Sequence, residues 1–436
     1  MPVVLESFNV ENMKEISRVA FLLTGVPKVR QVFVPPDHDR DSFTEYIPQF
    51  IEALTKPLTE EEKKSGMYKP DIPPRIAMTG TYTEVQEFFQ GDLKGYTVPV
   101  AKWTDGLPIT PPTEELVARM LTGTSHKPDE VVNPKMGPRE LQVTVEKVAI
   151  NAVMAGCKPE YMPVALAMTE LGAWTGFPSA SSMGAFFVVG GPIGKELGMN
   201  SGMSFLSPGN PANATLGRFA VLAGINLGGT VIGVNSTGVM GNNLWGLTFA
   251  ENENSPWEGI NVDEGFKEKE SVLLKARMYV RLVPPGLNHT RQWKAAGMED
   301  PSEEPLADLI ASLKSWPEAW GRVVLVTPDL AKEWAKKYPF ASSIQKLQDY
   351  LWDHMTKTRA DWGKDWFFYM SSAFAKANPK GSRMLNPDHL AAPDDAPVPM
   401  LYSPEHIKII VAGGEGANWG WGTLSYYQAT SIDKWR

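Results

Sequence analysis

Apolar residues recur at helical spacing through the middle of this chain, and a short apolar run follows them. Five apolar positions within residues 145–153 form one helical stripe, which is expected to end at Gly156. Pro159 then stands in the first turn of a second predicted helix, which extends to Trp174. Residues 186–189 have the composition of a buried strand. The centre of the fold is therefore expected in this part of the sequence.

Helix and strand signals alternate along the rest of the chain as well. Short β-branched or apolar runs predict strands at residues 29–34, 75–79, 271–283, 322–327 and 407–412. Apolar stripes predict helices at residues 11–23, 42–54, 83–90, 113–121, 328–337 and 343–355. This alternation predicts an α/β fold of several layers, with mostly parallel or mixed sheets flanked by helices. The 36 prolines and 38 glycines predict that long loops rich in both residues connect these elements.

Capping residues mark the starts of two of these predicted helices. Ser42, followed by Glu45 three residues later, forms a capping-box pattern. Thr113 precedes a clear apolar stripe and is expected to act as an N-cap. Pro48 stands too late for the first turn of a helix that begins at Ser42, and we expect a kink there.

The length of 436 residues exceeds the usual size of one domain, and two or three domains are expected. Residues 1–100 are expected to form a small α/β domain with parallel strands. A proline-rich segment leads from there into a central α/β domain, residues 101–290, which carries the cysteine and glycine-rich loops. Residues 291–436 are expected to form a C-terminal α/β region with a loop-rich insert.

Composition and charge indicate a globular protein. The apolar share of 43% and the charged share of 21% are typical of soluble domains. The net charge of −8 opposes binding to nucleic acid or to an anionic membrane, since either partner favours a basic surface. No apolar run approaches the roughly 20 residues of a membrane helix, and no signal peptide is visible. A single cysteine fits a reducing compartment, so a cytoplasmic location is expected.

Cys157 lies in the tight connection between the two central helices, just before the second one begins. A helix N-terminus and a neighbouring cation, here Lys158, both stabilise a thiolate. These neighbours favour a reactive cysteine that acts as a nucleophile or a redox thiol. The alternative is that Cys157 is a small buried hydrophobic residue, which is the commoner fate of a lone cysteine.

Glycine and asparagine residues around a third predicted helix suggest a site for an anion. Gly191 follows the central strand, and Asn210 caps a helix that carries Asn213 and, two turns along, Arg218. Free backbone N–H groups at a helix start bind carboxylate or phosphate, and Arg218 would add a fixed positive charge. Helix capping and close packing explain the same residues equally well. The fingerprints GxGxxG and GxxxxGK[ST] are absent in the required context, which opposes a nucleotide site.

A second glycine turn follows the predicted strand at residues 407–412. Gly413 and Gly414 open this turn, and glycine allows the backbone to approach a ligand closely. Glu415 adds negative charge, which weakens a phosphate site. Asn418 and Trp419 would instead hold an apolar or aromatic ligand.

Two glutamates supply the other candidate chemistry. Glu251 and Glu253 are two residues apart, so they share one face of a strand or reach one ion from a loop. Such a pair suits a hard metal cation, or acid–base catalysis by Glu251, and a surface turn that ends at Pro256 is the alternative. The six histidines lack metal-binding spacing such as HExxH, although His38 between two aspartates is a candidate ligand. No cofactor is identified by these patterns.

Several phrases resemble those of bacterial proteins in the family associated with the UGSC (selenocysteine-or-cysteine) domain. These phrases are WTDGLPITPPTEELVARML, VTVEKVAINAVMAGCKPEYMPV, SPGNPANATLGR, FAENENSPWE and IIVAGGEG. The stretch ALTKPLTEEEK is similar to the end of the UGSC-like region itself. The resemblance implies thiol chemistry, but no Gly-Ser-Cys occurs in this sequence. Any such chemistry would rest on Cys157 or on a partner chain.

The sequence supports three functional hypotheses. In the first, the chain is an enzyme that acts on a small anionic or aromatic molecule in an internal pocket, through Cys157. In the second, it is a metal-assisted hydrolase or lyase that uses Glu251 and Glu253 with a distant histidine. In the third, it is a non-catalytic subunit of a larger assembly, formed with copies of itself or with a partner protein.

Overall fold

The structure is a computed structural model of the chain, and it describes most but not all residues. The described residues are 30–33, 42–64, 75–91, 103–174, 183–232, 236, 247–279, 283–286, 306–315, 321–364, 387–424 and 426–436. The predicted helix at residues 11–23 and the candidate ligand His38 lie outside these ranges.

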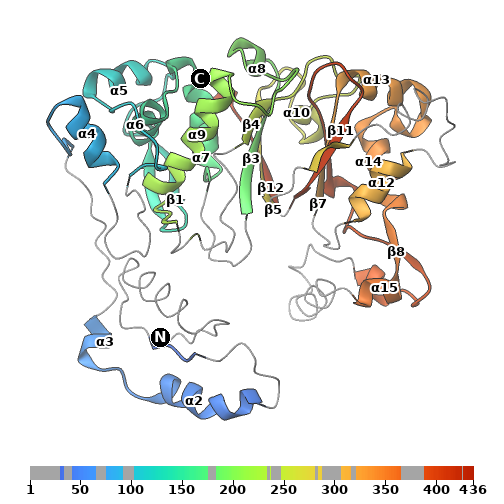
Figure 1. The fold of residues 1–436 in the computed structure, drawn as a ribbon, viewed down its shortest axis with the longest axis horizontal. Coiled ribbons are helices and arrows are strands. Elements are labelled where there is room, and N and C mark those ends of the chain that lie inside the picture. Colours follow the sequence, from blue (N-terminus) through green and yellow to red (C-terminus); the bar gives the residue numbers. More distant parts are fainter. Residues whose placement is uncertain are drawn as a thin grey trace.

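Two four-stranded mixed sheets form the centre of the molecule (Figure 1). The first sheet has the order β12-β5-β3-β4, with bounds Tyr426–Ser431, Val272–Tyr279, Met183–Gly190 and Leu247–Ala250. The second sheet has the order β10-β7-β11-β6, with bounds Ile407–Val411, Gly321–Val326, Trp419–Leu424 and Val283–Gly286. In each sheet one edge pair, β3 with β4 or β10 with β7, is parallel, and the other pairs are antiparallel. The predicted α/β class is confirmed.

The sheets pack face to face between two layers of helices. Helices α6 (Val145–Ala155), α7 (Met162–Glu170) and α9 (Pro211–Asn226) share an apolar core with the outer face of the first sheet. Helices α12 (Ala307–Lys314), α13 (Pro328–Lys337) and α14 (Ile344–His354) do the same for the second sheet. A third apolar core lies between the sheets. The result is a four-layer arrangement of helices, sheet, sheet and helices (Figure 1).

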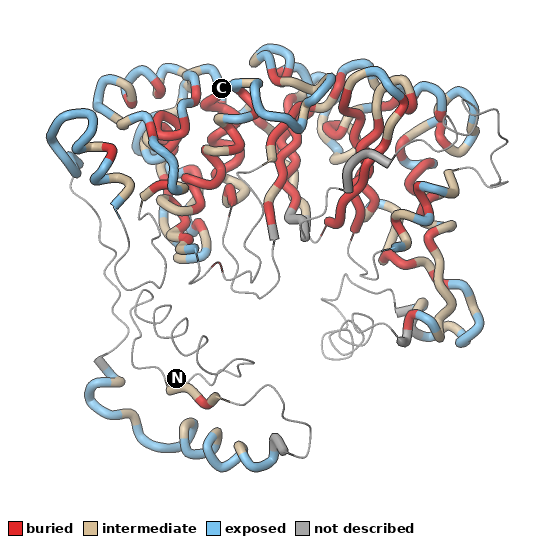
Figure 2. The backbone as a smooth tube through the Cα atoms, in the orientation of Figure 1, coloured by how far each residue is buried: buried red, intermediate tan, exposed pale blue. Residues whose placement is uncertain are grey.

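Strand periodicity explains why three separate cores can form. Along β3, Phe187 belongs to the helix-facing core and Phe186 to the core between the sheets. Along β7, Val324 faces helices and Val323 faces the other sheet. Successive side chains of a strand point to opposite faces, so strands that are apolar at every position bury both faces. Each such buried side chain contributes roughly 1.5–3 kcal/mol, and Figure 2 shows burial concentrated in these strands and the facing helices.

The two sheets repeat one pattern and exchange one strand each. In the first, β3 is followed by helices, then by β4 parallel to it and β5 antiparallel to it; β7, β10 and β11 repeat this order in the second. The fourth strand of each sheet comes from the other half, because β6 pairs with β11 and β12 pairs with β5. Strands on both sides of residue 290 therefore contribute to both sheets.

The local signals around the central helices are confirmed. Helix α6 ends at Gly156, which has the left-handed φ of 83° that glycine adopts without strain. The Thr113 side chain accepts a hydrogen bond from the Leu116 N–H and caps α5 (Glu114–Leu121). The second central helix is shorter than predicted, because a 3₁₀ turn, η2 (Pro159–Tyr161), precedes α7 and α7 ends at Glu170.

Two predictions in the N-terminal part are wrong. Residues 75–79 form no strand, because they lead into a helix, α4 (Tyr82–Phe89), whose capping box joins Thr81 and Glu84. Pro48 causes no kink, because a 3₁₀ turn, η1 (Ser42–Tyr46), ends before it and Pro48 stands in the first turn of α2 (Ile47–Thr55). No strand occurs among the described residues between 30 and 91, so the parallel sheet expected there is not seen in them.

Shorter elements complete the described fold. Two small antiparallel pairs, β1 with β2 and β8 with β9, lie outside the main sheets. The remaining elements are α3 (Glu60–Lys64), β1 (Val131–Met136), β2 (Leu141–Thr144), α8 (Ile193–Glu196), α10 (Ile260–Asp263), η3 (Pro339–Ala341), β8 (Thr356–Thr358), α15 (Arg359–Lys364), α17 (Pro387–Ala391), β9 (Pro397–Pro399), η4 (Pro404–His406) and η5 (Asp433–Trp435). Across the described ranges, every helix is too short or too polar to cross a membrane.

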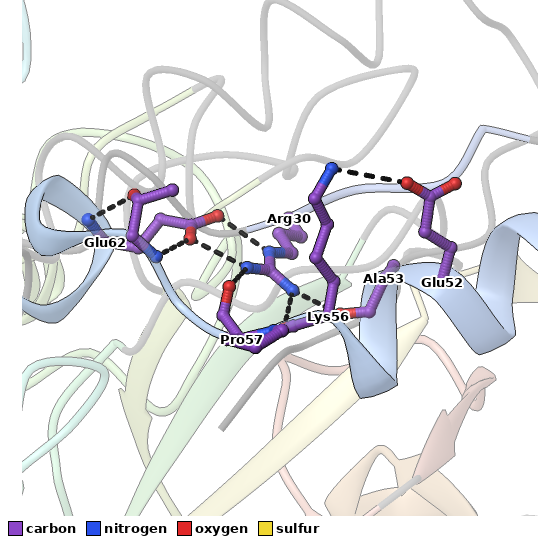
Figure 3. A network of polar contacts seen from close by, with 7 residues as sticks. Arg30, Glu52, Ala53, Lys56, Pro57 and Glu62 are labelled. Atoms are coloured by element: carbon purple, nitrogen blue, oxygen red, sulfur yellow. Dashed lines mark hydrogen bonds and ion pairs between the residues drawn. The ribbon is translucent and has the colours of Figure 1, made fainter.

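A single arginine organises the segment that contains α2 and α3 (Figure 3). The Arg30 guanidinium donates to both carboxylate oxygens of Glu62, at 2.7 and 2.8 Å, and to the carbonyl oxygens of Ala53, Lys56 and Pro57. These hydrogen bonds join residues 30–33 to the end of α2 and to α3. The hydrogen bond from Arg30 is also the main reason that the pKa of Glu62 falls to about 2.

Candidate functional site

The carboxyl ends of the two parallel strand pairs meet at one edge of the molecule, which we call the carboxyl edge. The chain continues the ladder beyond β4 and β10, because Glu251 N–H donates to Val189 O and Ala412 N–H donates to Val326 O. Asn252 N–H then donates to Val411 O at 2.8 Å, which joins the end of β4 in one sheet to the end of β10 in the other. Ligand sites of α/β folds lie beyond such carboxyl ends, so this edge is the candidate functional site.

Residues 199–207, here called the edge segment, lie over this junction. The Ser201 carbonyl oxygen accepts two hydrogen bonds, from Gly413 N–H at 2.8 Å and from Asn252 Nδ2 at 3.1 Å. Gly198 and Gly209 flank the segment with φ of 64° and 127°, and both have open space where a side chain would stand. The predicted turns at Gly209 and Gly413 thus come together, and the edge segment fills the space between them.

Asn210 and Asn213 hold the edge segment from the start of α9. Asn210 is the N-cap that the sequence predicted, and its Oδ1 accepts from Asn213 N–H at 3.0 Å. Its Nδ2 donates to Gly198 O at 2.8 Å. The Asn213 side chain accepts from Asn200 N–H at 3.1 Å and donates to Asn200 O at 2.9 Å. Asn213 therefore binds backbone of the edge segment in this structure, and Asn210 binds the backbone of Gly198, next to the segment.

Apolar contacts add to these hydrogen bonds. The Phe205 ring packs edge-on against Phe249, with ring centroids 4.8 Å apart. Gly414 lies directly under Met203, since a Cβ at Gly414 would stand 2.8–3.1 Å from the backbone nitrogen, Cα and Cβ of Met203. The Met203 side chain itself is 72% exposed. Glycine at position 414 is therefore required for close approach of two backbones, as the sequence suggested for a ligand.

Glu251 is the titratable group at the carboxyl edge. Burial is the main reason that its pKa rises to about 8, the charge of Asp263 raises it further, and a hydrogen bond from Ile260 N–H opposes the shift. That bond, at 2.8 Å, occupies Oε2, whereas Oε1 has no accessible surface, and the backbone N–H of Val411 also lowers the pKa of the carboxyl. A carboxyl group with this pKa is mostly protonated at pH 7 and can donate a proton or, once ionised, accept one.

The predicted pairing of Glu251 with Glu253 is wrong. Glu253 is exposed, and both of its carboxylate oxygens accept from Lys195 Nζ at 2.9 Å. The chain turns after β4, so the two side chains do not share a strand face as their spacing suggested. The described ranges contain no group of three or more His, Cys, Asp and Glu residues arranged to hold a metal ion.

The predicted reactive thiolate is contradicted as well. Cys157 is buried in the apolar core of α6, α7 and α9, and this burial raises the pKa of its thiol to about 12. Lys158 supplies no stabilising charge to the sulfur, since its exposed ammonium lies 3.9 Å from Glu160. The thiol is paired instead with Thr215, which lies two residues beyond Asn213 and so on another face of α9. Cys157 fits the alternative of a small buried hydrophobic residue.

Arg218 binds Asp105 and nearby backbone of the chain rather than an open ligand site. Its guanidinium donates to both carboxylate oxygens of Asp105 at 2.9 Å. It also donates to the carbonyl oxygens of Leu107 and Pro108. These bonds fix the turn that precedes α5, so the positive charge predicted for an anion site is neutralised within the chain.

The second glycine turn binds a carboxylate of the chain itself. Asp329 Oδ2 accepts from Gly416 N–H at 3.1 Å and from Ala417 N–H at 2.8 Å. Burial raises the pKa of Asp329, but these hydrogen bonds and one with Thr327 outweigh it, and the pKa is lowered. Asn418 pairs through its backbone with Thr327. The anion-binding amides expected in this turn are therefore occupied at positions 416 and 417.

Two further predicted ligand residues serve packing. A side chain at Gly191 would meet the Glu270 carbonyl oxygen at 2.4 Å, so this glycine lets the turn after β3 close against the start of β5. Trp419 lies in β11 and is buried in the core under α13 and α14. Among the described residues, no hydrogen bond or ion pair joins either of them to the edge segment, and a ligand-binding role for them stays a prediction.

Sequence reasoning missed the residues that complete the carboxyl edge. Asn252 was passed over although it stands between the two glutamates, and Phe205 and Ser201 lie in a stretch rich in glycine, serine and asparagine. A signal was available, because Met203, Phe205 and Leu206 are large apolar residues within a segment bounded by glycines. Apolar residues in such a polar loop indicate a segment that packs onto something.

A shallow hollow occurs elsewhere on the surface. It has a volume of about 400 Å³ and is lined by Ala307, Ile310, Ala311, Lys314, Ser315 and Lys357. None of the residues predicted from the sequence lines it, and it presents no acid–base group other than two lysines.

Comparison with known proteins adds no assignment: no protein-family model, curated protein or solved structure matches this chain. The resemblance to the UGSC-like family stays a prediction. The residues of the carboxyl edge are therefore the basis of the function proposed below.

Proposed function

We propose that the chain is an enzyme that transfers a proton to or from a small organic molecule at the carboxyl edge, with Glu251 as the acid–base group. One observation carries the proposal: the Glu251 carboxyl is buried at the end of β4 and its pKa rises to about 8, although the backbone N–H groups of Ile260 and Val411 both lower it. A buried titratable group with a strongly shifted pKa is a candidate for a functional site.

The chemistry of this group suits catalysis near neutral pH. An acid–base catalyst works best when its pKa lies close to the working pH, because both protonation states are then populated. Protonated Glu251 would give its proton to an oxygen or carbon of the substrate and would recover one from the product or from water. The proton is the only atom that moves in this step, and no oxidant or reductant is needed.

The two other routes suggested by the sequence receive less support. A thiol mechanism requires a thiolate, and burial keeps the Cys157 thiol protonated. A metal site that uses both glutamates requires Glu253, which is bound to Lys195 at the surface. From the second hypothesis we therefore keep only acid–base catalysis by Glu251, without a metal ion and without Glu253.

The test compares two glutamates that differ by two positions. The purified chain is incubated in D₂O with small ketones, carboxylic acids, amides and esters, and proton NMR follows exchange of their C–H groups. For the compounds that exchange, Glu251→Gln is expected to reduce the rate at least about 100-fold, the usual contribution of an acid–base group. Glu253→Gln is the matched control and should change it less than twofold. Equal rates in Glu251→Gln and the unaltered chain would remove Glu251 from the mechanism.

The location and assembly of the chain are part of the same proposal. A cytoplasmic location fits a single buried cysteine, since no disulfide is available to a chain with one thiol. The negative net charge fits a small-molecule substrate better than a nucleic acid.

A role as a subunit of a larger assembly is the second candidate function. It is supported by apolar side chains exposed in and before α4, among them Ile76 at 64% and Tyr82 at 66%. Exposed apolar groups of this kind mark protein interfaces when they lie together. Native mass spectrometry of the unaltered chain and of Tyr82→Glu would test it, with a loss of higher-mass species expected in the variant.

A further inference from the structure

We propose that the edge segment occupies the place of the ligand, and that the ligand is a small aromatic carbonyl compound. This inference rests on the proposed function for the location of the site, and it adds the substrate class and the element that must move. Asn252 Nδ2 and Gly413 N–H would bind the carbonyl oxygen, and Phe249 would bind the ring.

The carbonyl part follows from the hydrogen bonds of Ser201. Its oxygen receives two N–H donors that come from the ends of strands in different sheets, at 2.8 and 3.1 Å. Two convergent donors on one oxygen are the arrangement by which enzymes bind a carbonyl and stabilise negative charge on it. Glu251 stands next to Asn252 in the chain, which places an acid–base group beside these donors in sequence.

The aromatic part follows from Phe205. Its ring lies 4.8 Å from that of Phe249 in an edge-on contact, and one of its ring carbons lies near Gly413. Phe249 is fully buried, so departure of Phe205 would uncover an aromatic wall close to the backbone that carries the Gly413 donor. A ligand that replaces both Ser201 and Phe205 needs a carbonyl group and an aromatic ring.

The edge segment has the features of an element that can leave. Met203 and Leu206 are exposed, and Ser204 adopts a left-handed φ of 60°, which is unfavourable for a residue other than glycine or asparagine. The left-handed glycines on both sides give the backbone freedom to pivot. Its hydrogen bonds to the body are made with Gly194, Asn213, Asn252 and Gly413, so opening exposes polar groups that water can satisfy.

Two substitutions open the segment without altering the proposed carbonyl donors. Gly414→Ala places a methyl group 2.8–3.1 Å from Met203 backbone and side-chain atoms, so the segment must shift. Asn213→Ala removes the hydrogen bonds to Asn200 from the opposite side. Gly202→Ala is the control within the segment, because its added carbon would meet only the Asn200 side-chain oxygen, at an ordinary 3.7 Å. Hydrogen–deuterium exchange of residues 199–207 reports whether each variant opens.

The probe is 4-fluorobenzamide, followed by fluorine NMR, with 4-fluorotoluene as the ring without a carbonyl. Gly414→Ala and Asn213→Ala are expected to exchange faster in the segment and to bind 4-fluorobenzamide at least about tenfold more tightly than the unaltered chain. Gly202→Ala should behave as the unaltered chain. Adding Asn252→Asp, which replaces the donor by an acceptor of the same size, should abolish the gain. Neither opened variant should bind 4-fluorotoluene comparably.

Three results would overturn the inference. The first is that neither opening variant accelerates exchange in the segment. The second is opening without a gain in 4-fluorobenzamide affinity, and the third is a gain that survives Asn252→Asp or is shared by 4-fluorotoluene. Glu251→Gln in the Gly414→Ala background should still bind the probe. Loss of proton transfer with retained binding would therefore test the proposed function separately from the ligand class.

Discussion

The carboxyl edge and the Arg218–Asp105 contact on α9, here called the α6–α9 face, both contain residues that the sequence predicted to bind a ligand, and they differ in what satisfies their polar groups. At the face, Arg218 pairs with Asp105, and both groups are largely buried. At the edge, Asn213, Asn252 and Gly413 bind backbone atoms of a segment in which four of nine residues are exposed and one is buried. Pairs of the first kind separate only when the fold opens, whereas pairs of the second kind can separate locally.

The difference shows that a hydrogen-bonding group indicates a ligand site only where its partner in the chain can separate from it locally. Arg218 and Gly413 are equally well satisfied by hydrogen bonds. Only Gly413 has a partner, Ser201, in a segment bounded by flexible glycines. Substitutions in each region test this difference.

The largest effect is expected at the α6–α9 face. Arg218→Met leaves the Asp105 carboxylate buried without its partner, and the free energy of unfolding should fall by about 3–5 kcal/mol. Lys195→Met, which removes the exposed pair with Glu253, is the control and should cost about 0–1 kcal/mol. Urea unfolding followed by circular dichroism measures both. Similar small losses in the two variants would mean that Asp105 is hydrated when unpaired.

The next effect concerns the pH dependence of the carboxyl edge. The pKa of Glu251 is about 8 in the fold and 4.5 for the free side chain, so the folded state holds an extra proton between these values. The contribution of Glu251 to the free energy of unfolding is greatest below pH 4.5. It decreases by about 1.4 kcal/mol per pH unit as the pH rises towards 8. From pH 5 to pH 8 the chain should lose up to about 4 kcal/mol relative to Glu251→Gln. Parallel pH profiles of the two proteins would contradict the raised pKa.

A smaller effect is expected at Cys157. With a pKa of about 12, roughly one thiol in 10⁵ is ionised at pH 7, so iodoacetamide should label the folded protein no faster than it unfolds. Cys157→Ala removes a small buried group and should lower the free energy of unfolding by about 1 kcal/mol. Mass spectrometry during labelling at several urea concentrations provides the measurement. Rapid labelling without denaturant would contradict the raised pKa and would show that Cys157 is reactive in the folded protein.

The smallest effect is expected at Met203. Met203→Gln replaces an exposed side chain, so the free energy of unfolding should change by less than about 0.5 kcal/mol. The melting temperature, read by differential scanning calorimetry, should match that of the unaltered chain. A loss above 1 kcal/mol would show that the edge segment is part of the stable core.

Elements with strong local signals were predictable from sequence. The α6 stripe, the Gly156 end, the Asn210 cap and the run of β10 depend on neighbours within a few residues, and all four are found. The strand predicted at residues 75–79 is not found, because a strand also needs a distant partner strand that the local sequence does not specify.

The chemistry of the candidate residues could not be predicted in the same way. The signal at Cys157 was a helix start and a lysine, but its pKa is set by apolar residues from three helices. The signal at Arg218 was its place on α9, but its partner lies more than 100 positions away. Glu251 was selected for its spacing from Glu253, whereas its unusual pKa comes from burial and from the charge of Asp263, twelve positions away.

The exchange of strands also has a consequence for how the protein is made. The sheet begun at residue 183 obtains its fourth strand only when residues 426–431 have left the ribosome. Because β5 is complete at residue 279, about 150 residues before the end of β12, the wait of β5 for this strand lasts roughly 8–30 s at the usual rates of translation. During that time β5 presents an unpaired edge to other nascent chains. Synthesis of this protein should therefore depend on chaperones that shield such edges until release.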